Sequence, residues 1–316
     1  MENPWLSVIV PSHNGERWLG AALQSLVEQK DQGIEVIVID TSATDASLQI
    51  INGFSDKLDI RAERRPDLLR WPAKTNFGVE QSRAEQICIL HQDDLWLPNR
   101  CAELRKWLSS WPDAVMHLHP CYIIDEFGGR LGRWRCPLPN GQSPVPKQML
   151  LERLLVQNFI SIPAPTIRRD AYLSVGGLDN DLWYAPDWDL YLKIADSGDT
   201  YYHTAPLACY RIHKSSLTVS GSKNKRDFFD QHKFVVDRHV GRLSPQSRNK
   251  VLPVALASIK VNTALAAAIH GEISQIFKAL ISVLALGPRG IHKYFLYSRI
   301  VDRVFPRLRA LVGGKF

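Results

Sequence analysis

Residues 87–98 read Ile87-Cys88-Ile89-Leu90, then His91-Gln92-Asp93-Asp94, then Leu95-Trp96-Leu97-Pro98. The short apolar run predicts a buried strand, and the proline is typical of the first turn of a helix. Asp93 and Asp94 are therefore expected in the loop at the carboxyl end of that strand. In open α/β sheets this is the edge along which ligands bind.

The pair Asp93-Asp94 leaves two interpretations open. Adjacent carboxylates repel each other unless a cation or hydrogen-bond donors share the site. A hard divalent ion that also holds phosphate oxygens would satisfy both carboxylates. The alternative is an exposed Asp-Asp turn that leads into a helix, and the pair alone does not decide between the two.

Strand and helix patterns alternate through the first hundred residues. Strands are expected at 6–11, 35–40, 59–63 and 87–90, and helices at 16–28, after Thr44-Asp45, and at 73–81. This alternation predicts a mostly parallel sheet with helices on both faces. Polar residues follow the four strands at Ser12 to Asn14, Asp40, Arg64-Arg65 and Asp93-Asp94. Four strand ends would then meet at one nucleotide-sized cleft.

Two common nucleotide-binding motifs are absent from the sequence. No Gly-x-Gly-x-x-Gly follows the first strand, and the chain has no Gly-Lys-Ser/Thr loop. Both the dinucleotide-binding class and the P-loop class are therefore disfavoured.

The second half of the chain changes character towards its end. Strands are expected at 114–119, 122–125 and 207–213, and a helix at 147–156. Residues 128–146, rich in Gly, Pro and Arg, predict a flexible loop over the cleft. A helix is expected to begin near Asp187, with Asp187 and Asp189 in its first turn. From about Lys223 the patterns predict helices alone, so we expect a first domain at 1–220 and a helical region at 221–316.

Composition places the chain among ordinary globular proteins. It has 316 residues, of which 45% are hydrophobic and 22% charged. No run reaches the roughly 18 apolar residues of a membrane span, and Met1 to Pro4 lead directly into a strand pattern, so no signal peptide is expected. The five cysteines are scattered, odd in number and without a Cys-x-x-Cys pair. This usage disfavours a disulfide framework or a zinc site and fits a reducing cytoplasm.

Positive charge is concentrated in the tail. The net charge is +7, and residues 287–316 hold seven Lys or Arg against one Asp, which gives 7 − 1 = +6. A nearly neutral body argues against a nucleic-acid groove. Arg299, Arg303 and Arg307 recur at helical spacing beside apolar residues, a pattern suited to an anionic membrane surface. The alternative is a helix that packs on the first domain with a solvated basic face, and Pro306 weakens the membrane interpretation.

Seven short motifs occur in order between residues 6 and 218. They are Ser7 to Asn14, Val38 to Asp45, Lys74 to Gly78, Leu90 to Pro98, Gly176 to Asp179, Asp187 to Leu190, and Tyr210 to His213. In this order they resemble the motifs of family 2 glycosyltransferases. The resemblance implies the GT-A fold, an α/β architecture with a mostly parallel sheet flanked by helices and a Rossmann-like nucleotide-binding half, followed here by an α-helical C-terminal region. It also implies sugar transfer from a nucleotide-sugar donor with inversion at the anomeric carbon.

The resemblance further implies roles for individual residues. Asp40 would accept a hydrogen bond from the donor's base, and Asp187 would be the general base that takes the acceptor's proton. Asp93 and Asp94 would hold Mg²⁺ or Mn²⁺ against the diphosphate, with His213 as a further ligand that favours Mn²⁺. The remaining implied contacts are Pro11, Asn14, Lys74 and Arg211 for the donor, and Trp183 and Trp188 as stacking surfaces for the acceptor.

Three positions depart from the family pattern. One is Thr41, because the family usually has two paired aspartates after the second strand and this chain has Asp40-Thr41. The first aspartate of the Asp-x-Asp signature is His91 here, and the acid that usually precedes the catalytic aspartate is Pro186. We expect His91 to be a hydrogen-bonded, partly buried histidine rather than a ligand. The departures leave open a degenerate member that binds nucleotide or glycan without efficient turnover. A metal-dependent nucleotidyltransferase is a second alternative, although it would give the segment around Asp187 no task.

The favoured expectation is a metal-dependent, inverting glycosyltransferase in the cytoplasm. Its donor is expected to be a UDP-sugar and its acceptor a saccharide or a lipid-linked intermediate, as in bacterial surface polysaccharide synthesis. The tail is expected to make any peripheral contact with the inner face of the membrane, and no nucleic-acid partner is expected.

Overall fold

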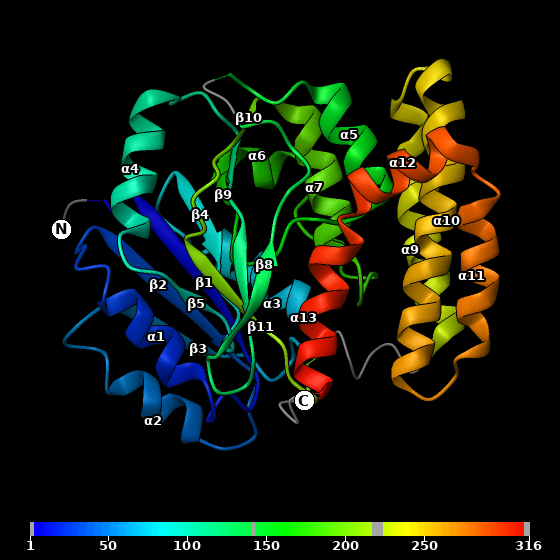
Figure 1. Ribbon diagram of the computed structural model, residues 1–316. Coiled ribbons are helices and arrows are strands. Elements are labelled where there is room, and N and C mark those ends of the chain that lie inside the picture. Colours follow the sequence, from blue (N-terminus) through cyan, green and yellow to red (C-terminus); the bar gives the residue numbers. More distant parts are fainter. Residues whose placement is uncertain (1–2, 141–142, 217–223, 313–316) are drawn as a thin grey trace.

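The computed structural model describes residues 3–140, 143–216 and 224–312. Its centre is a sheet that contains seven strands within these residues (Figure 1). In spatial order the strands are β10 (Thr200–Tyr202), β6 (Met116–Leu118), β9 (Thr166–Arg168), β4 (Gln86–Ile89), β1 (Leu6–Ser12), β2 (Ile34–Asp40) and β3 (Asp59–Arg64). Only β9 is antiparallel to its neighbours in this sheet, so the expected mostly parallel sheet is confirmed.

Helices cover both faces of this sheet. Every residue of β1 and β2 is buried, as is usual for parallel strands between two helical layers. Val8 and Val10 pack in a core with α1 (Leu19–Val27), α2 (Ala46–Asn52) and α4 (Arg100–Ser110). Ile9 faces the opposite core, which contains α3 (Trp71–Glu80), α5 (Lys147–Val156), α6 (Arg169–Ser174) and α7 (Pro186–Ser197). All five cysteines are buried and unpaired.

The strand register brings the polar strand ends together. Ser12 lies opposite Asp40, and Asp40 lies opposite Arg64. The Leu90 N–H donates to the Ile9 carbonyl at 2.9 Å, so the chain leaves β4 next to the end of β1. The convergence expected from the sequence is therefore confirmed.

A second, smaller sheet lies beside the carboxyl ends of the first. It contains β5 (Leu95–Trp96), β11 (Ala208–Arg211), β7 (Cys121–Ile124) and β8 (Arg130–Trp134). Two expectations from the sequence are wrong here. Pro98 does not open the next helix, because α4 begins at Arg100 after an N-cap at Asn99 with φ +66°. Residues 128–146 are not all loop, because β8 pairs with β7, while residues 141–142 lie outside the described ranges.

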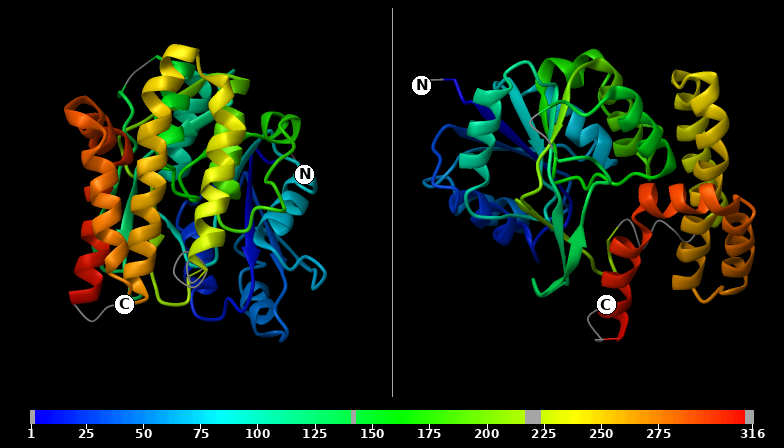
Figure 2. Two further views of the ribbon diagram at one scale, coloured as in Figure 1. Left: turned by 90° about the vertical axis from the view of Figure 1, so that its right-hand side faces the viewer. Right: turned by 45° about the horizontal axis from the view of Figure 1, so that its top comes forward.

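The described chain after residue 223 is helical, as expected. The elements are α9 (Lys225–His239), a 3-10 turn η2 (Val240–Arg242), α10 (Pro245–Ile269), α11 (Ser274–Leu284), α12 (Gly287–Ser298) and α13 (Ile300–Val312). Figure 2 shows α9, α10 and α11 standing as a bundle beside the sheet. Buried Asp189 joins the two parts, because its carboxylate contacts Arg238 at 3.1 Å and His239 at 2.7 Å. The expected boundary at residues 220–221 lies outside the described residues.

Helix α10 is longer and more apolar than the sequence analysis allowed. Its segment Pro245–Ala268 meets the length and hydropathy criteria for a membrane span, contrary to the expectation that no run would. Half of the apolar window is buried inside the protein, where α10 packs on α5, α9 and α11. A core helix passes the same test of length and composition.

Helix α13 returns from the bundle to the second sheet. Pro306 lies inside this helix and packs on β8. A Cβ added to Gly132 of β8 would lie only 2.5 Å from Cγ of Pro306. Glycine is therefore required for this close approach. Asp302 fixes the helix further by accepting two hydrogen bonds from Arg135, at 2.7 and 2.9 Å. Arg303 and Arg307, expected on a membrane-facing or solvated basic face, instead line the internal cavity described below.

Candidate active site

The ends of β1 and β2 place polar groups around Asp40. Its carboxylate is fully buried, and Oδ1 accepts a hydrogen bond from the Ser42 hydroxyl at 2.7 Å. Oδ2 is also buried and has no hydrogen-bond partner among the described residues. Such an oxygen is costly to bury unless a ligand donates to it. Pro11 is buried in β1, and Asn14 lies in the following loop with φ +48°, where its N–H donates to Ser42.

Lys74 reaches the loops after β1 and β2 from α3. Its Nζ donates to the Ser12 carbonyl at 2.8 Å and to the Thr41 hydroxyl at 3.2 Å, so it ties the two loops together. Burial lowers the pKa of Lys74 to about 8, although the charge of Asp40 opposes this shift. The lysine therefore places a positive charge beside Asp40 and holds the loop backbone.

Three side chains after β4 form a compact group of potential ligands. The ligand atoms of His91, Asp93 and Asp94 all lie within 4.8 Å of one another. Asp94 is buried, and its Oδ1 accepts a hydrogen bond from the Arg211 N–H at 2.9 Å. Asp94 Oδ2 and His91 Nε2 are both buried without a hydrogen-bond partner in the described chain. The expectation that His91 is a satisfied histidine is therefore wrong.

This group fits a divalent metal. Burial lowers the pKa of His91, so its imidazole is neutral and Nε2 can offer a lone pair. Burial and the neighbouring charge of Asp93 raise the pKa of Asp94 well above its ordinary value. A cation would reverse that shift, because it favours the ionised carboxylate. One imidazole and two carboxylates form a donor set that suits a divalent ion.

His213 reaches the metal-ligand group through Asp93. Its Nε2 lies 2.8 Å from Asp93 Oδ2, and its Nδ1 lies 2.9 Å from the Ser215 hydroxyl. Burial acts to raise the pKa of Asp93, but this hydrogen bond and nearby histidines outweigh it and lower the pKa. In the structure His213 is therefore a partner of Asp93, and its expected role as a direct ligand remains a prediction.

Arg211 uses its side chain on the protein backbone. Nε donates to the Asp93 carbonyl at 2.7 Å, and Nη1 donates to the Asp125 and Glu126 carbonyls at 2.9 and 3.2 Å. These contacts hold the loop after β4 against the β7–β8 turn. The position supports the metal-ligand loop, and the contact with the donor expected for Arg211 remains a prediction.

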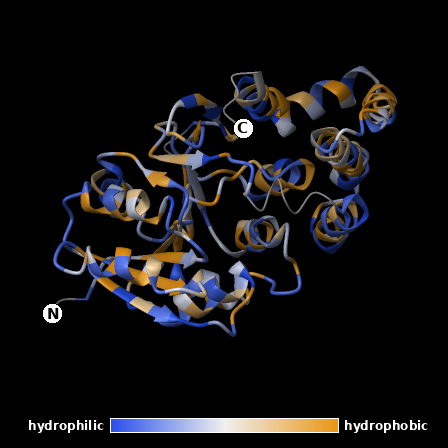
Figure 3. Ribbon diagram, turned by 90° about the horizontal axis from the view of Figure 1, so that it is seen from below, coloured by the Kyte–Doolittle hydropathy of each residue, from blue (hydrophilic) through white to orange (hydrophobic). Residues whose placement is uncertain are grey.

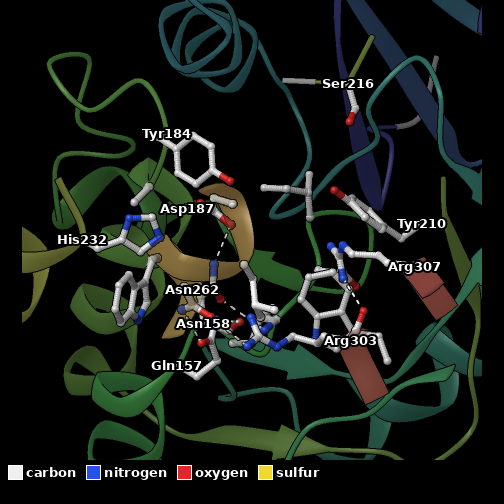
Figure 4. A pocket seen from close by; sticks show the side chains of 18 of the residues that line it. Gln157, Asn158, Tyr184, Asp187, Tyr210, Ser216, His232, Asn262, Arg303 and Arg307 are labelled. Carbon is white, nitrogen blue, oxygen red and sulfur yellow. Dashed lines mark hydrogen bonds between the residues drawn. The ribbon is translucent and has the colours of Figure 1, made fainter. Parts of the chain in front are cut away.

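A cavity of about 260 Å³ connects the metal-ligand group with Asp187. Because Pro186 opens α7, Asp187 lies in the first turn of that helix, at the cavity wall. Its Oδ2 accepts a hydrogen bond from the Asn158 amide at 2.7 Å (Figure 4). Burial raises the pKa of Asp187 to about 6, although this hydrogen bond opposes the shift. A carboxylate with that pKa accepts a proton effectively near neutral pH.

The two tryptophans expected to stack on an acceptor are both anchored by their indole N–H groups. Trp188 is 2% exposed, and its Nε1 donates to the Leu154 carbonyl at 2.7 Å. Trp183 donates to Asp227 on α9 at 2.7 Å and is not part of the cavity wall. Trp188 nevertheless belongs to the cavity wall, and the stacking role expected for the two tryptophans remains a prediction. The aromatic residues with a place in the cavity wall include Trp71, Trp134, Tyr184 and Tyr210.

Several cavity residues were not assigned to the site by the sequence analysis. They come from the end of α5, from the segment before α7 and from the helical region. Figure 4 shows them around Asp187: Gln157, Asn158, Tyr184, Asn262, Arg303 and Arg307. Asn158 could have been identified from the sequence as a candidate site residue, because its side-chain amide directly follows an expected helix, where a cleft can lie. The sequence contained no such signal for Asn262, Arg303 and Arg307, because only the packing of α10 and α13 brings these residues to the cavity.

Comparison with known sequences gives one family. The profile described as Glycosyl transferase family 2 matches residues 7–176. An uncharacterized glycosyltransferase of Haemophilus influenzae is 25% identical over 221 residues, which are 68% of this chain and 71% of that protein. An uncharacterized glycosyltransferase of Rickettsia typhi is 22% identical over 219 residues, which are 68% of this chain and 66% of that protein.

Comparison with solved structures gives the same fold. S. aureus TarS 1-349 in complex with UDP-GlcNAc is 16% identical with a TM-score of 0.62, and the match covers 98% of this chain and 92% of that one. Full TarS is matched over 54% of its length. The mannosyltransferase PcManGT from Pyrobaculum calidifontis, in complex with GDP-Man and Mn²⁺, is 18% identical with a TM-score of 0.57, covering 98% of this chain and 88% of its own. At these identities the likeness establishes the GT-A fold.

Proposed function

Because the chain belongs to glycosyl transferase family 2, we propose that this glycosyltransferase transfers a sugar from a UDP-sugar to a saccharide or lipid-linked acceptor, with inversion at the anomeric carbon. One observation carries the proposal. Half-buried Asp187, with a pKa raised to about 6 by burial, lines the same cavity as His91 and Asp93 of the metal-ligand group. A proton acceptor and a diphosphate site in one cavity are what a single displacement requires.

The donor's base is assigned to the strand ends around Asp40. Its unpartnered, buried Oδ2 can accept a hydrogen bond from a ring N–H such as that of uracil. Pro11 and Asn14 form the adjoining loop, and Lys74 supplies a neighbouring positive charge. Solved relatives in complex with UDP-GlcNAc and with GDP-Man are consistent with a nucleotide-sugar donor for this fold.

The diphosphate is assigned to the group His91, Asp93 and Asp94. These residues would hold Mn²⁺ or Mg²⁺, and an imidazole among the ligands favours Mn²⁺. When bound, the ion offsets negative charge on the leaving nucleoside diphosphate. His213 is assigned to orienting Asp93, and Arg211 to holding the loop that carries both aspartates.

Asp187 is assigned the role of general base. The acceptor hydroxyl oxygen forms a bond to the anomeric carbon as the bond from that carbon to the diphosphate oxygen breaks. The hydroxyl proton passes to Asp187, and the nucleoside diphosphate leaves with the bonding electron pair. Asn158 donates to Oδ2, so it helps to fix the orientation of the carboxylate.

The two alternatives are less well supported. A degenerate binder was suggested by His91 in place of an aspartate, but His91 Nε2 is unpartnered and close to both aspartates, as a ligand would be. Pro186 occupies the first position of α7, where proline is favoured, and leaves Asp187 at the cavity. A nucleotidyltransferase would give the base at Asp187 no substrate proton to take.

The proposal also concerns the place of the protein in the cell. Five buried, unpaired cysteines fit a reducing cytoplasm. Exposed apolar side chains gather on α11, and they include Phe277, Leu280, Ile281 and Leu284. In Figure 3 the outermost helix, which is α11 by its place in Figure 1, carries many hydrophobic residues. We assign this face to peripheral contact with the inner face of the membrane, where a lipid-linked acceptor for surface polysaccharide would be found.

Residues 1–220 would then bind the donor and carry the base, and residues 221–316 would complete the acceptor end. The test is a donor panel in which release of nucleoside diphosphate is measured with extracted lipid-linked and soluble saccharides. We expect acceptor-dependent release from one uridine donor that requires Mn²⁺ and is lost in Asp187→Asn. Equal release from wild type and Asp187→Asn would refute the assigned base, and release of pyrophosphate would indicate a nucleotidyltransferase.

A further inference from the structure

Two arginines of α13 line the cavity without an acidic partner. Arg303 and Arg307 belong to the wall that faces Asn262 and Tyr184 (Figure 4). Among the described residues neither forms an ion pair: Arg303 Nη2 donates to the Asn262 side-chain oxygen at 3.0 Å, and Arg307 Nη1 donates to the Arg303 carbonyl at 2.7 Å. Arg303 Nε is buried without any hydrogen-bond partner. Guanidinium donors therefore remain available on the cavity side.

This arrangement is electrostatically unfavourable in the protein alone. Burial, and then the like charge of Arg307, lower the pKa of Arg303 to about 10. Asp302 of the same helix shows the contrasting case, since Arg299, just before the helix, and Arg135, just after β8, both lie near its carboxylate. Two cations held in a partly dry cavity are stabilised by an anion that accepts from both. Unpaired charges of this kind gather at functional sites.

The fold keeps both arginines in place. The close contact of Pro306 with Gly132 and the ion pair of Asp302 with Arg135 fix α13 on β8, on either side of Arg303. Asn262 links Arg303 to Gln157, because it accepts a hydrogen bond from Arg303 and its own amide donates to the Gln157 side chain at 2.8 Å. Gln157 precedes Asn158, the residue that binds Asp187. The arginine pair and the proposed base thus lie on one continuous polar wall of the cavity.

We propose that Arg303 and Arg307 bind an anionic group of the acceptor, a phosphate or a carboxylate, while its hydroxyl lies at Asp187. The inference rests on the proposed function and narrows its acceptor to an anionic saccharide or a phosphate-bearing one. A guanidinium pair suits either anion, because each guanidinium presents two parallel N–H donors to a pair of oxygens. The helical region thereby sets the specificity of the enzyme for its acceptor.

The test compares matched anionic and neutral compounds on the full-length chain. Glycerol 3-phosphate is paired with glycerol and glucuronate with glucose, and each is titrated calorimetrically with and without UDP and Mn²⁺. The variant is Arg303→Gln with Arg307→Gln. The control is Arg309→Gln, which changes an exposed arginine of the same helix that contacts the Leu131 carbonyl instead. Circular dichroism verifies that both variants fold.

We expect one anionic compound to bind wild type and Arg309→Gln at least tenfold more tightly than its neutral match. The double variant should lose at least tenfold of that affinity and keep its affinity for UDP with Mn²⁺ within twofold. Whether phosphate or carboxylate binds identifies the anion. Equal binding of charged and neutral compounds overturns the proposal. The proposal is also overturned if the double variant loses affinity for UDP and keeps its affinity for the anionic compound, because the arginines would then bind the donor's diphosphate. If wild type binds the anionic compound through the arginines but binds no nucleotide, the anion site stands and the proposed transfer reaction fails.

Discussion

The side-chain amide of Asn158 donates a hydrogen bond of 2.7 Å to Oδ2 of Asp187, at the wall of the cavity that also contains Asp93. The two residues come from different elements, since Asn158 follows α5 and Asp187 lies in the first turn of α7. The contact helps to fix the orientation of the carboxylate at the cavity wall. It also stabilises the ionised form, so it opposes the rise in pKa that burial causes.

The activity should therefore depend on pH through Asp187. We expect kcat/KM to rise with pH through a midpoint near 6, because the base must be ionised and its pKa is about 6. Asn158→Ala removes a donor to the ionised carboxylate, so it should move the midpoint upward. The measurement is a pH profile at saturating Mn²⁺, with the exposed Asn52→Ala as the control. A midpoint that Asn158→Ala leaves unchanged would count against Asp187 as the base.

Replacing Asp187 should separate stability from activity. The pKa is about 6 in the folded protein against 3.8 for the ordinary carboxyl, so ionisation disfavours the fold. The loss of folding free energy caused by ionisation is absent below pH 3.8, grows between pH 3.8 and about 6, and is complete above about 6. At pH 8 the free energy of unfolding of Asp187→Asn should therefore exceed that of wild type by up to ~3 kcal/mol, at 1.36 kcal/mol per pKa unit. The variant should then unfold at a higher denaturant concentration. Near pH 4 this difference should disappear.

The same variant should lose transfer activity by roughly 10²- to 10⁴-fold, the usual contribution of a general base. Chemical denaturation at both pH values and a transfer assay supply the two readings. An Asp187→Asn protein that is less stable than wild type at pH 8 would show that the carboxylate is structurally required.

His91 should influence which metal supports nucleotide binding. Imidazole nitrogen favours Mn²⁺ over Mg²⁺ more than carboxylate oxygen does. His91→Asp, which restores the acidic residue usual in the family, should therefore reduce the ratio of nucleotide affinity in Mn²⁺ to that in Mg²⁺. Asp113→Asn, an exposed position away from the group, serves as the control. An unchanged ratio in His91→Asp would remove His91 from the ligand set.

Membrane contact should depend on the apolar face of α11 rather than on the arginines of α13. Phe277 is 69% exposed, whereas Arg303 and Arg307 line the cavity. Phe277→Asp with Leu280→Asp should reduce co-sedimentation with liposomes several-fold, and added salt should have little effect, because apolar burial is not screened. The control is Phe127→Asp, which changes an exposed aromatic residue in the β7–β8 turn. Equal sedimentation of both variants would exclude α11 as the contact.

The sequence was sufficient for the parts of the site that lie close together in the chain. Each strand of the parallel sheet is followed directly by its polar residues, so the pattern alone placed Asp40 and Asp93 at one edge. Asp187 followed from a motif at the start of a helix. The placement of Asp40 and Asp93 depends on local hydrophobic periodicity, which the fold preserves, whereas the role of Asp187 came from the resemblance to family 2 glycosyltransferases.

The rest of the site depends on packing that no local pattern contains. Arg303 and Arg307 have helical spacing, but which face of α13 meets the cavity is decided by the contact of Pro306 with Gly132, more than 170 residues away in the chain. Trp188 was expected to be accessible, yet tertiary packing buries it and turns its indole N–H to Leu154. His91 was expected to be satisfied, and only the assembled loop shows its Nε2 without a partner.

The most direct test of the central claim is calorimetric titration of wild type and Asp93→Ala with UDP, GDP and dTDP, each with and without Mn²⁺. We predict that UDP binds wild type only when Mn²⁺ is present. Asp93→Ala should abolish this binding, because we propose that the ligand group and Asp40 together bind the donor. Binding of GDP or dTDP in place of UDP would correct the donor's base. Failure of all three nucleotides to bind wild type under either condition would contradict a nucleotide-sugar transferase and favour a degenerate member of the family.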